Sequence, residues 1–260
     1  MTKRPLAEVK PGDLPEAVDA AGTVETRLAE ALALLHAAAR PAELAGMARF
    51  GIVSAGRLGL SVPDMRRIAK TLGRDDELAI ALWDTGIPDA RIVAGMVADP
   101  ALLGSERMDR WALGFDSWDV CDQVCGSAFR ASPLAWEKVR DWADRSEEFV
   151  RRAAFALLAT LAVHDRISGD ARFIQALGHI EAASDDDRNF VRKAVNWALR
   201  NVGKRNAALN EAAIACALRI RERGTRAARW IAADALRELR GEAVQSRLAA
   251  RAKSPRSVSS

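Results

Sequence analysis

Trp118 and Asp122 are the residues whose types and spacing most favour chemistry in this chain of 260 residues. They stand four positions apart, so on a helix both side chains project from one face. An indole beside a carboxylate can stabilise a cationic group, through the ring face and the negative charge together. The alternative is a core tryptophan next to an acid that complements the dipole at a helix N-terminus.

Two further candidates, Arg152 and Trp197, lie in or just after a repeated pattern. The sequence EFVRRA at 148–153 is echoed by NFVRKA at 189–194, an offset of 41 residues. Helix pairs that recur about every 40 residues are typical of HEAT and armadillo repeats, which stack into a curved array. The alternative is a helical bundle without repeats, in which both residues are plain scaffold.

The elements that must position these residues are helices. Alanine and leucine dominate, tyrosine is absent and β-branched residues are sparse, which favours helix over sheet. Turn signals such as Ile87-Pro88, Asp99-Pro100 and Ser132-Pro133 separate the helical patterns. The predicted helices are 24–39, 41–52, 63–72, 75–83, 88–98, 105–112, 117–130, 133–144, 147–163, 170–182, 187–203, 207–222 and 226–240. We therefore expect an all-α helical-repeat solenoid of antiparallel helix pairs.

Charge is divided unevenly along the chain. Residues 188–260 hold 17 Lys and Arg against 5 Asp and Glu, a net +12, which leaves −8 for the preceding residues because the whole chain is +4. This asymmetry favours a face that binds a polyanion, although a solvated basic tail explains part of it. The candidate phosphate contacts are Arg151, Arg192, Lys193, Arg200, Lys204, Arg205, Arg226 and Arg229.

Composition argues against several other classes. No apolar run reaches the roughly 18 residues of a membrane span, and the N-terminus lacks an apolar signal core, so we expect a cytoplasmic protein. The three cysteines have no zinc spacing, and Cys121 and Cys125 are expected to be small buried hydrophobes. No glycine-rich phosphate loop is present. We therefore expect neither a structural zinc site nor nucleotide hydrolysis.

Taken in order, several short segments resemble the DNA alkylation repair glycosylases built from HEAT-like repeats, the AlkD family. The likeness covers roughly residues 45–240, and the segments are MARFG at 47–51, SVPDMR at 61–66, LWD at 82–84, SWDVCD at 117–122, FVRRA at 149–153 and AVNWALR at 194–200. The resemblance implies that Trp118, Asp122, Arg152 and Trp197 line the cleft that receives the lesion. It also implies recognition of duplex DNA through backbone and deoxyribose on a concave face, with the lesion left outside a base pocket.

The activity that the resemblance implies is hydrolysis of the N-glycosidic bond of N3- or N7-alkylated purines in double-stranded DNA, without a metal or an organic cofactor. Such a base already carries positive charge, so it leaves without a general acid. Asp122 would stabilise the positive charge that develops on the sugar and orient the attacking water. The two tryptophans would contact the sugar and lesion and exclude other water, and Arg152 would fix a phosphate.

The sequence predicts three segments: a flexible N-terminal extension at 1–22, the glycosylase domain at 23–240 and a flexible basic tail at 241–260. We expect a monomer that binds DNA and no membrane. No loop suited to wedge between bases is evident in the sequence. The alternative function is a non-catalytic helical-repeat scaffold that binds DNA or another protein, since a fold alone does not guarantee activity.

Overall fold

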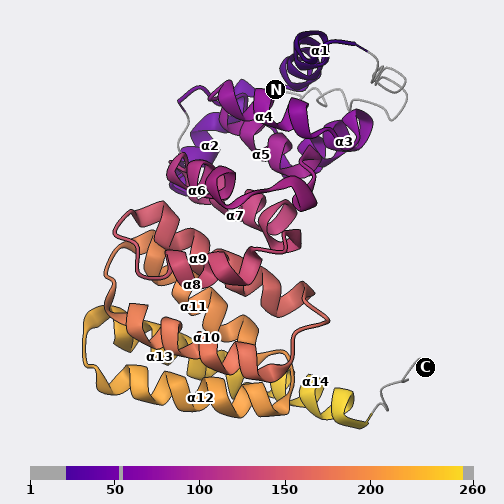
Figure 1. Ribbon diagram of the computed structural model, residues 1–260. Coiled ribbons are helices and arrows are strands. Elements are labelled where there is room, and N and C mark those ends of the chain that lie inside the picture. Colours follow the sequence, from indigo (N-terminus) through magenta and orange to yellow (C-terminus); the bar gives the residue numbers. More distant parts are fainter. Residues whose placement is uncertain (1–21, 53–54, 254–260) are drawn as a thin grey trace, which may run out of the picture.

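The computed structural model describes residues 22–52 and 55–253, and within these ranges every regular element is a helix. The stack runs from α1 (Val24–Ala37) at one end to α14 (Glu242–Lys253) at the other (Figure 1). None of the helices in the described ranges is both long and apolar enough to cross a membrane.

Two rows of helices form the body. The inner row, in which each helix contacts the next, comprises α3 (Val62–Leu72), α5 (Pro88–Val97), α7 (Trp118–Ser127), α9 (Glu148–His164), α11 (Asn189–Gly203) and α13 (Arg226–Leu239). The outer row comprises α4 (Asp76–Asp84), α6 (Ser105–Leu113), α8 (Ala135–Trp142), α10 (Asp170–Ala182) and α12 (Ala207–Glu222). This is the predicted all-α helical-repeat solenoid.

Short elements connect or flank these rows. They are α2 (Leu44–Arg49) and the 3₁₀ turns η1 (Pro41–Glu43), η2 (Pro100–Leu102), η3 (Phe129–Ala131) and η4 (Ala183–Asp185). The first turn of α3 shows how the sequence starts a helix: the Ser61 hydroxyl accepts from the backbone N–H of Asp64 at 3.3 Å, and Pro63 stands in the first turn, where no N–H is needed.

Helix α9 is the centre of the inner row. It is buried around most of its circumference, and alanines supply much of that buried surface. Because alanine side chains are short, α7 and α11 approach α9 closely from both sides. The 41-residue echo identifies equivalent positions in two units, since the rings of Phe149 on α9 and Phe190 on α11 stack with centroids 5.5 Å apart.

The structure tests only one of the two predicted terminal segments. Residues 1–21 of the predicted extension lie outside the described residues. The predicted tail is wrong over 242–253, which form α14 and bury Val244 and Leu248 against the preceding helices. These two apolar residues stand one turn apart on one face, a weak pattern that the many charges of the segment obscured. Residues 254–260 are also outside the described part.

Candidate functional site

Asp122 and Arg152 form a two-pronged ion pair between α7 and α9. Arg152 Nε donates to Asp122 Oδ1 at 3.0 Å, and Arg152 Nη2 donates to Oδ2 at 2.8 Å. A third donor, Arg152 Nη1, bonds the backbone carbonyl of Phe190 on α11 at 2.6 Å. The arginine therefore ties three helices of the inner row together at the point where the carboxylate lies.

The environment of Asp122 acts on its charge in two directions. Burial raises the pKa of its carboxyl group above the usual value, and the neighbouring Arg152 partly offsets that rise. The Asp122 side chain keeps 15% of its surface exposed, against 6% for Arg152. A carboxylate has about four lone-pair sites, and Arg152 uses two, so the exposed side of Asp122 can still accept from or act on a ligand.

Trp118 lies one turn before Asp122 and borders the same ion pair. The Arg152 guanidinium carbon is 5.9 Å from the centre of the Trp118 ring. The indole N–H donates to the backbone carbonyl of Phe50 at 3.0 Å, which brings the end of α2 to the site. The Phe50 side chain itself is 74% exposed. The structure thus brings Trp118, Asp122 and Arg152 together.

The segment after α2 is a neighbour that sequence reasoning did not place at the site. Gly51 follows Phe50 with φ +73°, and a Cβ built on it would stand 3.3 Å from the Phe190 ring. This close approach connects α2 to α11, more than 100 residues later. The available signal was a glycine after an aromatic residue in a segment that already carried the resemblance.

Trp197 lies farther along α11 and is partly buried against the core. It stands seven residues, about two turns or roughly 10 Å, beyond Phe190 on the same face of the helix. Among the described residues, no hydrogen bond, ring contact or cation–π contact links Trp197 to Asp122. The structure thus brings Trp118, Asp122 and Arg152 into contact, and the place of Trp197 in the same cleft stays a prediction.

Arg152 has a different role from the expected phosphate anchor. Its guanidinium is buried against protein acceptors, so its observed contacts hold Asp122 and Phe190 in place. Behind it, the Cys121 and Cys125 thiols are buried and face the carbonyls of Phe149 and Ala153. Burial raises the pKa of Cys121 well above its usual value, which keeps this thiol protonated. The described residues contain no cluster of three or more potential metal ligands.

The candidate phosphate contacts divide into paired and unpaired cations. Arg151 bonds Asp186 at 3.2 Å, and Arg226 lies 3.7 Å from Asp187. The acidic residues just before α11, Asp186 and Asp187, thus pair with arginines of α9 and α13. Lys193 is exposed, and the guanidinium of Arg192 lies 4.9 Å from the centre of the Trp230 ring.

The remaining candidates are bound more firmly by the protein. Arg200 pairs with Glu238 at 2.5 Å, and Lys204 pairs with the same carboxylate at 2.7 Å. Arg229 bonds the carbonyl of Gly224 at 2.5 Å. Arg205 caps the end of α9, donating to the carbonyls of Ala162 and Asp165 at 2.7 and 2.9 Å. These contacts show that part of the basic excess in the sequence is used within the protein.

Comparisons with known proteins place this geometry. The family described as DNA alkylation repair enzyme matches residues 31–239. No curated protein matches the chain. A solved structure described as "a new family of proteins related to the HEAT-like repeat DNA glycosylases with affinity for branched DNA structures" gives a TM-score of 0.66 at 22% identity, covering 74% of this chain and 82% of that one. A designed armadillo repeat protein gives a TM-score of 0.35 at 15% identity, covering 85% and 96%. The chain belongs to the DNA alkylation repair enzyme family.

Proposed function

We propose that the protein is a DNA glycosylase that releases N3- or N7-alkylated purines from duplex DNA, and that Asp122 is its central catalytic residue. The observation that carries this proposal is the partly exposed Asp122 carboxylate beside the Trp118 indole, held from behind by Arg152. A scaffold gains little from keeping a buried ion pair open to solvent on one side. A site for a cationic sugar needs that arrangement.

The chemistry requires little beyond a fixed negative charge. The alkylated base is already positive, so the bond from sugar to base lengthens without proton donation, and positive charge develops on the deoxyribose. Asp122 stabilises that charge and orients the water that attacks the anomeric carbon. The base leaves with the bonding electrons, and the water proton passes to solvent or to Asp122. Trp118 contacts the sugar, and Arg152 acts as a positioning residue.

Trp197 and the cations of the inner row complete the proposed DNA-binding face. A duplex that meets Asp122 on α7 also meets Trp197 and exposed cations such as Lys193 along α11. Arg192 and Arg226 extend this face toward α13. Phosphate contacts of this kind provide affinity and register without reading the base sequence. We also propose that the unit responsible is residues 23–240 acting as a monomer, with α14 packed on its end.

The test compares Asp122→Asn with the matched control Asp119→Asn. Asp119 is one turn away on α7 and forms a comparable ion pair, 2.8 Å from Arg57. Both substitutions lose an arginine partner, but only Asp122→Asn removes the proposed catalytic charge. We expect Asp122→Asn to slow single-turnover release of 7-methylguanine by about tenfold to a thousandfold, or roughly 1.4–4 kcal/mol of barrier. Asp119→Asn should release 7-methylguanine at the wild-type rate once the rate is corrected for the fraction of folded protein, which circular dichroism measures.

Two outcomes would contradict the proposal. Equal excision rates for Asp122→Asn and the wild type would remove Asp122 from the mechanism. No release of either 3-methyladenine or 7-methylguanine by the wild type, with intact DNA binding, would favour the non-catalytic scaffold. A branched duplex should be included as a substrate for binding, because the solved relative is described by its affinity for branched DNA.

A further inference from the structure

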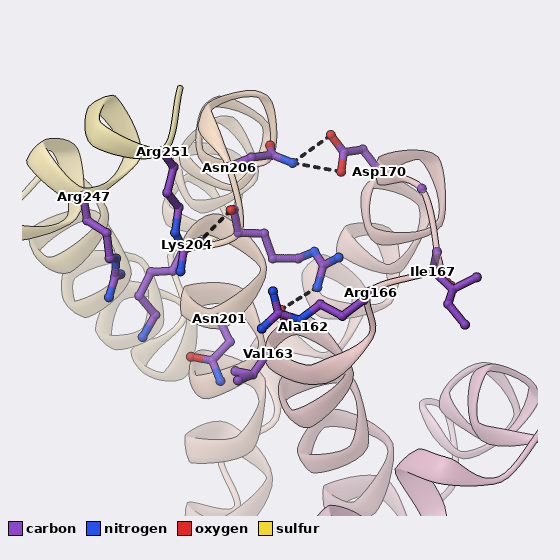
Figure 2. Close-up of a pocket in the computed structure, with 13 residues that line it drawn as sticks. Ala162, Val163, Arg166, Ile167, Asp170, Asn201, Lys204, Asn206, Arg247 and Arg251 are labelled. Atoms are coloured by element: carbon purple, nitrogen blue, oxygen red, sulfur yellow. Dashed lines mark hydrogen bonds between the residues drawn. The ribbon is translucent and has the colours of Figure 1, made fainter. Parts of the chain in front are cut away.

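A basic pocket lies at the opposite ends of the inner helices from Asp122. It has a volume of about 660 Å³ and is bounded by the loop after α9, the turn between α11 and α12, and α14 (Figure 2). Five cations line it, Arg166, Lys204, Arg205, Arg247 and Arg251, against one carboxylate, Asp170. Two of the five arise from α14, the segment expected to be a tail.

Lys204 pairs with Glu238 at 2.7 Å, but among the described residues the four arginines of this pocket form no ion pair with a carboxylate. Arg166 and Arg247 are exposed. Arg251 donates only to backbone, with Nη1 3.2 Å from the carbonyl of Arg205. The single carboxylate, Asp170, is engaged by the amide of Asn206 at 2.9 Å. The charge of the pocket therefore favours an anion as its ligand.

Two of the guanidinium groups lie near enough for one charge to act on the other. Arg205 is fixed by carbonyls at the end of α9, and Arg166 extends into the pocket from the loop after α9 (Figure 2). Burial lowers the pKa of Arg205, the nearby carboxylates of Asp165 and Asp170 raise it, and the charge of Arg166 lowers it. A phosphate bound between the two guanidinium groups would provide a further counter-charge for both.

The loop that carries Arg166 also presents an apolar side chain to solvent. Ile167 is 97% exposed and points away from the pocket in Figure 2. The loop is nevertheless braced, because the Asp165 carboxylate accepts from the backbone N–H groups of Ile167 and Ser168 at 2.9 and 2.8 Å and from the Trp136 indole at 2.9 Å. A rigid loop with a fully exposed isoleucine among cations has the features of a groove-inserting wedge.

We propose that this pocket holds backbone phosphates of duplex DNA and that Ile167 enters the adjacent groove, as a second DNA contact remote from Asp122. The inference rests on the DNA-binding part of the proposed function. Lys204 lies 14 residues, or roughly 21 Å, beyond Phe190 along α11, farther than the width of a major groove, about 12 Å. The pocket therefore contacts phosphates other than those beside the lesion.

A second group of cations continues the same edge. The ends of α3, α5 and α7 enclose a pocket of about 410 Å³ that contains Arg66, Lys70, Arg74 and Arg130 and no carboxylate. His164, at the end of α9, links the two pockets, because Arg130 and Arg166 both act with burial to lower its pKa. The phosphate-binding edge thus extends along much of the solenoid. A membrane surface fits less well, since only two of the described apolar residues that line the first pocket, Val163 and Ile167, are exposed.

The first test measures duplex binding against salt for the double variant Arg166→Ala with Arg247→Ala. Its control is Arg140→Ala with Arg221→Ala, which removes the same charge from exposed arginines that pair with adjacent acids. We expect the pocket variant to lower the slope of log K against log salt by about two units and to weaken binding roughly five- to tenfold per contact at 0.1 M salt. The control should change neither. Equal effects of the two variants would overturn the phosphate assignment.

The second test isolates the wedge with Ile167→Ala against Ile174→Ala, an isoleucine of α10 that is 51% exposed. We expect Ile167→Ala to weaken binding to nicked or mismatched duplex at least threefold while leaving the salt slope unchanged, because no phosphate contact is lost. It should also reduce the fluorescence change of a 2-aminopurine placed in the contacted step. Identical behaviour of the two variants would refute the wedge.

The outcomes separate this inference from the proposed activity. Binding is measured on undamaged DNA, so loss of excision in Asp122→Asn leaves the pocket result unaffected. An unchanged salt slope together with normal excision would refute the pocket alone. Vesicles of phosphatidylserine and phosphatidylcholine provide the last arm: binding to them that depends on Arg166, Arg247 and Ile167, with unchanged DNA affinity, would replace DNA by a membrane.

Discussion

The two ends of the inner helices use positive charge differently. At the edge where α7, α9 and α11 begin, here the N-edge, Arg57, Arg151 and Arg152 all pair with carboxylates. At the edge where these helices end, here the C-edge, Arg130 and Arg205 bond backbone carbonyls and Arg166 has no carboxylate partner in the described structure. The three N-edge arginines hold the site together, whereas Arg130, Arg166 and Arg205 form no ion pair with a carboxylate among the described residues and can still attract an anion.

This difference changes how the basic excess of the chain is understood. Residues 188–260 carry most of it, yet Arg200 and Lys204 share Glu238 within the protein. By contrast, Arg66 and Lys70 precede that segment and lie in a pocket without carboxylates. The distribution of charge along the sequence therefore predicts that the protein binds a polyanion, but it does not predict which surface binds it.

The largest expected contrast is in stability. Arg152→Gln leaves Asp122 buried without its counter-charge and should lower the free energy of unfolding by about 3 kcal/mol at neutral pH. Arg247→Gln at the C-edge should change it by less than about 0.5 kcal/mol, because the side chain is exposed. Urea unfolding followed by circular dichroism measures both. Similar losses for the two variants would break the distinction between the edges.

A smaller effect on stability is expected for Arg205, a C-edge arginine that is held by backbone carbonyls. Arg205→Ala removes the cap of α9 and the contact with Phe173, whose ring centre is 3.9 Å from the guanidinium carbon. We expect a loss of about 1–3 kcal/mol of unfolding free energy. Arg166→Ala, from the same pocket, should be neutral in the same thermal or urea melt, and a destabilised Arg166→Ala would show that the pocket cations are structural.

DNA binding provides a third comparison, between two cations of α11. Lys193 is exposed, whereas Arg200 lies against Glu238 and Asp234 at 2.5 and 3.5 Å. Lys193→Ala should lower the salt slope of duplex binding by about one unit, and Arg200→Ala by clearly less, because Arg200 already has counter-charges. Anisotropy titrations at four salt concentrations are sufficient. A larger effect of Arg200→Ala would mean that its ion pairs open on DNA.

The smallest effect concerns pH at the N-edge. Burial raises the pKa of Asp122 above its usual 3.8, so single-turnover excision should fall on the acid side at a pH above 3.8. Arg152→Gln should move this limb higher still. In the folded Arg152→Gln variant, Asp122 then holds a proton at pH values where Asp122 of the unfolded chain has lost it. The loss of unfolding free energy caused by Arg152→Gln should therefore shrink as pH falls through the raised pKa of Asp122. If the acid side of the pH–rate profile is the same in Arg152→Gln and the wild type, Arg152 does not control the charge of Asp122.

Much of the site was readable from local patterns because its residues follow helix spacing. Trp118 and Asp122 share a face by their four-residue separation, and the echo of Phe149 at Phe190 marked the repeat that brings Arg152 beside them. Phe50 was not placed there, because no periodicity relates the end of α2 to α7 and α11. Gly51 and Phe190 come close although they are more than 100 residues apart, and no local pattern in the sequence relates them.

Apart from α14, the sequence by itself determined the helices, their approximate ends and the repeat, since these depend on side-chain spacing, caps and breakers within a few residues. It also determined that the protein is basic enough to bind a polyanion. Only the tertiary structure decided which cations are neutralised, because Glu238 reaches Arg200 and Lys204 from another helix. It likewise decided that Ile167 stands exposed on a braced loop, since burial depends on neighbours that are distant in sequence.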